Sequence, residues 1–91
     1  MLYVWMGLLK ADAGPVPQEV QQQVSEFLSQ PFITVRYAGQ LLDSAGRRSG
    51  MLMIFEHDSR EAAEAFVEGS PYRRAGLYAT DGLYEYRDEV G

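Results

Sequence analysis

His57 is the only histidine in this chain of 91 residues, and histidine is the side chain best suited to general-base chemistry near neutral pH. It follows an apolar run and precedes a predicted helix, so it lies at a strand end. It could be a ligand-binding or catalytic group, or a polar residue that only ends the strand. The second interpretation is favoured, because the sequence offers no obvious partner. Glu56, His57 and Asp58 are consecutive and cannot all face one ion from a strand, so we expect no metal site.

Two pairs of arginines could bind an anion, because the guanidinium group matches carboxylate and phosphate. Arg47 and Arg48 fall in a polar, glycine-rich loop, so we expect both to be solvated. Arg73 and Arg74 follow the Ser-Pro-Tyr turn at residues 70–72 and are better placed for a ligand. Three acidic residues recur at helical spacing opposite an apolar stripe, which indicates a solvated face and not a metal site: Glu61, Glu64 and Glu68.

The six tyrosines and Trp5 are the remaining chemical feature. Aromatic side chains with hydroxyl groups could line a cavity for a planar small molecule. The alternative is a sheet-to-sheet core that uses these rings as packing material. We favour the packing role for most of them.

Composition excludes several classes of protein. The chain has no cysteine, which rules out a disulfide scaffold, cysteine-ligated zinc and a cysteine nucleophile. A formal net charge of −5 argues against nucleic-acid binding. The apolar stretch at residues 2–9 is shorter than the roughly 20 residues of a membrane span and lacks the basic start of a signal peptide. We therefore expect a cytoplasmic protein without a cofactor.

The elements that must position these residues follow from periodicity. Strands are predicted over residues 2–9, 32–42, 51–55 and 77–87, with bulges or breaks at Gly39 and at Asp81–Gly82. On the last strand, Tyr78, Tyr84 and Tyr86 are expected to share one side. A helix ending at Pro31 carries the stripe Val20, Val24, Phe27 and Leu28. A second helix, capped by Asp58 or Ser59 and stopped by Gly69, carries Ala62, Ala63, Phe66 and Val67. A short helical turn at 70–76 is predicted next.

The order strand, helix, strand, strand, helix, strand predicts the ferredoxin-like α+β fold, a four-stranded antiparallel sheet with two helices on one face. The other face would be open, yet the strands are apolar or aromatic on both sides. The simplest cover is a second copy of the chain, so we expect a homodimer packed sheet to sheet. A fixed partner of another kind is the alternative.

Three segments, residues 1–4, 37–39 and 70–78, resemble the YciI-like, or YCII-related, family. The segment before the last strand of that family has Asp-Pro-Tyr or Asp-Pro-Phe, a few residues, then Ala-Gly and an aromatic. The matching residues here are Pro71, Tyr72, Ala75, Gly76 and Tyr78. Residues 61–63 and 65–66 also fit the family's second helix. The resemblance implies one domain over residues 1–91 with the dimeric α+β barrel fold.

The resemblance also implies a catalytic pair, a histidine on the first helix and an aspartate before the proline. Here Ser70 stands where the aspartate would be, and the first predicted helix has glutamines but no histidine. Neither residue type supplies a group that titrates near neutral pH. We therefore expect a small-molecule-binding protein that is non-catalytic or has altered chemistry.

An enzyme remains the alternative. It would be a cofactor-free lyase or isomerase, or a monooxygenase-like enzyme, acting on a small aromatic or lactone metabolite. The ligand is expected to be neutral or anionic. The expected ligand-binding residues are Ser70, Tyr72, Arg73, Arg74 and His57.

Overall fold

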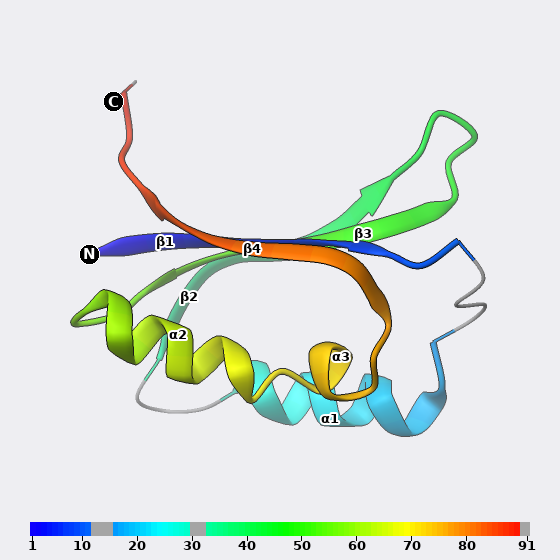
Figure 1. Ribbon diagram of the computed structural model, residues 1–91, viewed down its shortest axis with the longest axis horizontal. Coiled ribbons are helices and arrows are strands. Elements are labelled where there is room, and N and C mark those ends of the chain that lie inside the picture. The colour runs from blue at the N-terminus through cyan, green and yellow to red at the C-terminus, as the bar shows by residue number, and fades with distance from the viewer. Residues whose placement is uncertain (12–15, 30–32, 90–91) are drawn as a thin grey trace.

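The computed structural model describes residues 1–11, 16–29 and 33–89. The strands are β1 (Leu2–Leu9), β2 (Thr34–Leu42), β3 (Arg48–Glu56) and β4 (Tyr78–Tyr86), and the helices are α1 (Gln18–Leu28), α2 (Arg60–Glu68) and α3 (Pro71–Arg74). The strands form one antiparallel sheet in the order β2-β3-β1-β4, and the helices lie on one side of it (Figure 1). The predicted ferredoxin-like α+β fold is confirmed, with α3 as the short predicted turn. Pro31, Phe32 and most of the first predicted loop lie outside the described residues.

The core lies between the sheet and the helices and is built from aromatic rings. Tyr3 of β1 and Phe55 of β3 are directly opposite in the sheet, and both are fully buried. The ring of Phe66 on α2 lies 4.9 Å from Phe55 and stacks at 4.5 Å on Phe27 of α1. This chain of rings ties both long helices to the centre of the sheet.

Ser59 caps α2, which resolves the two alternatives at this helix start. Its hydroxyl accepts a hydrogen bond from the backbone N–H of Ala62 at 3.1 Å. Asp58 instead accepts nothing from the first turn, and its own N–H donates to the ring Nδ1 of His57 at 2.9 Å.

Replacing Ser59 with alanine should lower the free energy of unfolding by about 1 kcal/mol, because one N–H of the first turn loses its partner. Denaturant unfolding of Ser59→Ala measures this loss of stability, and Asp58→Ala is the control variant. Equal losses in the two variants would show that the hydroxyl is not what caps the helix.

The irregularity in β2 lies at Arg36 and not at Gly39. Val35 is opposite Phe55 and Tyr37 is opposite Ile54, so Arg36 is the extra residue. A Cβ added at Gly39 would meet nothing within 4 Å, so the predicted bulge or close approach there is wrong. Strict alternation would place Val35 and Tyr37 on the same side of the sheet. The extra residue between them shifts the alternation by one, so Val35 faces the helices and Tyr37 faces the other side.

The strand β4 is continuous through Asp81 and Gly82, so the break predicted there is wrong as well. Its irregularity lies at Ala79, because Tyr78 is opposite Leu9 while Thr80 is opposite Leu8. The extra residue reverses the alternation and sends the Tyr78 ring to the helix side, where it meets Trp5 edge-on at 5.4 Å. Tyr78, Tyr84 and Tyr86 therefore do not share one side.

Gly7 of β1 leaves space for the Tyr78 ring on the helix side of the sheet. A Cβ at residue 7 would lie 2.5 Å from the Tyr78 ring, so only a glycine lets that ring lie flat against β1.

The opposite face of the sheet is apolar and carries no described helix (Figure 1). Cross-strand pairing places Val4 between Ile54 and Tyr84, and Met6 beside Leu52. Several large side chains there are strongly exposed, with 39% for Met6, 58% for Tyr84 and 71% for Tyr37. Exposed apolar side chains gathered on one face are typical of an interaction surface.

Within the described residues, no helix has the length and apolar character needed to cross a membrane.

Candidate functional site

A cleft of about 330 Å³ lies between α1, α3 and the strands β2 and β3. Its polar lining comes from Gln21 on α1, Gln40 on β2 and Arg48 at the start of β3. Its apolar lining includes Val24 and Leu28 on α1 and Met51 on β3, and Tyr72 of α3 also lines it. The volume is at the small end of the roughly 300–1,000 Å³ typical of ligand pockets, which suits a compound of one ring.

A small apolar chamber adjoins this cleft on the side of the core. The cleft and the chamber share lining residues, among them Val24, Met51 and Tyr72, while Trp5 and Tyr78 line the chamber alone. The chamber measures about 20 Å³, room for one group of the size of a water molecule. Ser70, which is only 2% exposed, lines it as well, and its side chain caps no N–H of α3.

Two buried polar atoms at these cavities have no hydrogen-bond partner among the described residues, the Nε of Arg48 and the hydroxyl of Tyr78. The terminal guanidinium nitrogen of Arg48 does donate to the Tyr72 hydroxyl, and its Cζ lies 5.1 Å from the centre of the Tyr72 ring. Buried polar groups are nearly always paired, and an unpaired one marks a place where a ligand or water belongs. The Nε of Arg48 can only donate a hydrogen bond, and the Tyr78 hydroxyl can also donate, so a ligand with acceptor atoms would satisfy both.

Burial raises the pKa of Tyr78, and the nearby Tyr72 and Asp81 raise it further. Since the ordinary pKa of tyrosine is already near 10, the phenol of Tyr78 stays protonated at neutral pH. It can therefore donate a hydrogen bond to a ligand but cannot act as a general base there.

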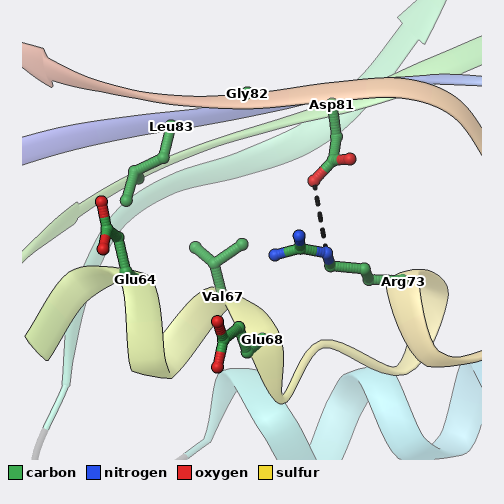
Figure 2. Close-up of a pocket in the computed structure, with 7 residues that line it drawn as sticks. All are labelled: Glu64, Val67, Glu68, Arg73, Asp81, Gly82 and Leu83. Carbon is green, nitrogen blue, oxygen red and sulfur yellow. Dashed lines mark ion pairs between the residues drawn. The ribbon is translucent and has the colours of Figure 1, made fainter. Parts of the chain in front are cut away.

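A second cavity of about 230 Å³ lies between α2, α3 and β4 (Figure 2). Arg73 and Asp81 face each other across it with 3.8 Å between Nε and the carboxylate oxygen. The same oxygen of Asp81 accepts a hydrogen bond from the indole N–H of Trp5 at 3.1 Å. The carboxylate thus holds the Trp5 ring in the wall of the chamber and uses up the only donor of that ring.

The five residues expected to bind a ligand do not lie together. Ser70 and Tyr72 both line the chamber. Arg73 lines the second cavity, and Arg74 lines a separate groove beside Gln23 of α1. His57 lies at the far end of β3 from Arg48, where its backbone exchanges hydrogen bonds of 3.0 and 3.2 Å with Met1.

Arg48 and Tyr78 line these cavities, although neither was among the five residues expected to bind a ligand. Arg48 was expected to be solvated in a loop, and this is wrong because β3 already begins there. Strict alternation would place Arg48 with Leu52 and Ile54 on the open face. Gly50 is opposite Leu41 and Arg48 is opposite Leu42, so the extra residue Ser49 turns Arg48 toward the helices. No sequence pattern predicts this register shift between β2 and β3.

Among the described residues, no group of three histidine, cysteine or acidic side chains is placed to hold a metal ion. The part of the chain that the structure describes therefore supplies no candidate metal centre.

No family model matches this sequence, and no curated protein matches it either. Solved structures do match. The chain superposes with a TM-score of 0.82 and 20% identity on 5-chloro-2-hydroxyhydroquinone dehydrochlorinase (TftG) from Burkholderia phenoliruptrix AC1100 in complex with 2,5-dihydroxybenzoquinone, covering 96% of this chain and 94% of that one. It also resembles Rv0793 from Mycobacterium tuberculosis, with a TM-score of 0.52 and 11% identity over 99% of this chain and 97% of that one. At these identities the comparisons support the α+β fold, and the chemistry has to be argued from the site.

Proposed function

We propose that this chain is a YciI-like protein that binds a small molecule in the cleft between α1, α3 and the strands β2 and β3. The observation that carries this proposal is the pair of buried donors without partners, the Nε of Arg48 and the hydroxyl of Tyr78. Their desolvation destabilises the empty protein, and a ligand with acceptor atoms would relieve it. The similarity to the structure of TftG in complex with 2,5-dihydroxybenzoquinone is in keeping with a small planar ligand.

The side chains of the cleft favour binding over acid–base catalysis. Of the described residues that line the cleft and its chamber, none is a histidine, an aspartate or a glutamate. Serine, glutamine, arginine and a buried tyrosine with a raised pKa cannot shuttle protons near neutral pH without a titratable partner. A reaction at this site would therefore use Ser70, Arg48 and Tyr78 as hydrogen-bonding groups and not as acid or base.

The working form in this proposal is a homodimer joined through the open face of the sheet. Each of the four strands contributes apolar side chains to this face, and the charged Glu56 at its edge is already paired with Arg36 at 2.8 Å. A largely apolar face of this kind can pair with its own copy about a twofold axis.

Filling the cleft tests the binding proposal. Ala38 of β2 lines both the cleft and the chamber, whereas Ala65 is exposed on α2. The probes are benzoate, benzamide, catechol and a simple lactone, followed by calorimetry and by the fluorescence of Trp5, the only tryptophan. We expect at least one probe to bind the wild type, and Ala38→Leu to weaken that binding by about tenfold or more because its branched side chain occupies the site.

The matched variant Ala65→Leu makes the same change outside the cleft and should bind as the wild type does. The proposal is wrong if no probe binds, or if Ala38→Leu binds as tightly as Ala65→Leu. Conversion of a bound probe by the wild type would show that the site also catalyses a reaction.

A further inference from the structure

We propose that the cleft selects a small planar organic acid in its anionic form, with Arg48 as the charge partner of the carboxylate and Tyr78 as a neutral second donor. This inference rests on the proposed function and names the class of ligand for that site.

Arg48 is the one arginine among the described residues that is not exposed. Arg36, Arg60 and Arg73 are each paired with a carboxylate, at 2.8, 3.0 and 3.8 Å. Arg48 is half-buried, and no described carboxylate lies within 4.0 Å of its guanidinium group. A buried cation without a counter-charge is costly, and an anionic ligand would supply the missing charge.

The guanidinium group of Arg48 retains a donor that no described residue uses. One terminal nitrogen of Arg48 donates a hydrogen bond to the neutral hydroxyl of Tyr72, while the Nε is buried and has no partner among the described residues. Arginine presents its donors in a rigid fork that fits a carboxylate or another oxyanion. The Tyr72 ring beside the guanidinium group also holds that fork in place.

The chamber supplies the second contact. Trp5 donates its N–H to Asp81, so Trp5 offers the ligand only an apolar surface. Tyr78 retains a protonated hydroxyl with no partner among the described residues. A chamber of about 20 Å³ accommodates one oxygen or other small group of the ligand and excludes a ring. The ring itself would lie in the outer cleft against Val24, Leu28 and Met51.

Benzoate and benzamide test the inference, because they have nearly the same shape and differ in charge. We expect the wild type to bind benzoate about tenfold more tightly than benzamide, since a charged partner strengthens the hydrogen bonds of Arg48. In Arg48→Met this preference should disappear through weaker benzoate binding, with benzamide changed by less than about threefold. Arg48→Lys should restore part of the preference, because it keeps the charge but not the fork.

Two further variants separate charge from packing. Arg47→Met removes a neighbouring exposed arginine and should leave the preference for benzoate unchanged. Tyr78→Phe should weaken benzoate and benzamide by similar factors, because it removes a neutral donor. Thermal unfolding of every variant confirms that the fold is retained, and benzoate binding should weaken as salt is added.

The outcomes separate this inference from the proposed function. Two outcomes would overturn the inference that the ligand is anionic while leaving the cleft as a binding site. One is equal affinity of the wild type for benzoate and benzamide, and the other is an unchanged preference for benzoate in Arg48→Met. Binding of catechol or the lactone without binding of benzoate overturns the inference alone. Failure of every probe to bind overturns the inference and the proposed function together.

Discussion

Phe66→Ala is expected to lower the free energy of unfolding by about 3–5 kcal/mol, the usual cost of removing a buried aromatic side chain. Phe66 is 7% exposed and lies between the rings of Phe27 at 4.5 Å and Phe55 at 4.9 Å. Its removal leaves a cavity at the point where both long helices meet the sheet. The two neighbouring rings belong to α1 and β3, so they cannot collapse into the gap without moving a helix.

Urea unfolding followed by circular dichroism measures this loss. Leu42→Ala is the control, because Leu42 is 60% exposed at the end of an edge strand and should cost less than about 0.5 kcal/mol. A loss below about 1 kcal/mol in Phe66→Ala would mean that these rings do not form the core.

If the proposed homodimer forms, Val4→Glu is expected to convert it to a monomer. Val4 lies on the open face in a central strand, opposite Ile54 on one side and Tyr84 on the other. A sheet-to-sheet dimer would bury this glutamate near the interface centre without a cation, at a cost of several kcal/mol for each copy. In the monomer the same side chain reaches water, so the fold should be retained.

Sedimentation equilibrium at micromolar concentration distinguishes the two states. Gln22→Glu introduces the same charge on the exposed side of α1 and should leave the dimer intact. The proposed dimer is refuted if the wild type is monomeric at these concentrations, or if Val4→Glu sediments as a dimer like the control.

The site shows how little of a binding cleft can be derived from local patterns. Ser70 and Tyr72 were found through a family resemblance, and they do line the chamber. Arg48 was assigned to solvent and Arg73 to the ligand, yet Arg48 lines the cleft and Arg73 pairs with Asp81 in another cavity. For Arg48 the difference arises from the extra residue Ser49, which puts the Arg48 side chain on the opposite face from the one that strict alternation gives. Arg73 lies on α3, and its partner Asp81 is supplied by the distant strand β4. Such register shifts depend on the partner strand and leave no local trace.

The sequence by itself determined the order of the elements, the apolar stripes of both long helices and the two-sided apolar character of β1 and β3. These features follow from short-range periodicity, which survives in any environment that buries apolar surface. Only the tertiary structure decided that Tyr3 and Trp5 face the helices while Val4 and Met6 face outward. It also decided that Tyr78 crosses to the helix side and that Arg48 and Tyr78 become donors without partners beside one cleft. Those outcomes depend on pairing between strands that are distant in the chain, and that pairing is set by the packing of the whole sheet against its helices.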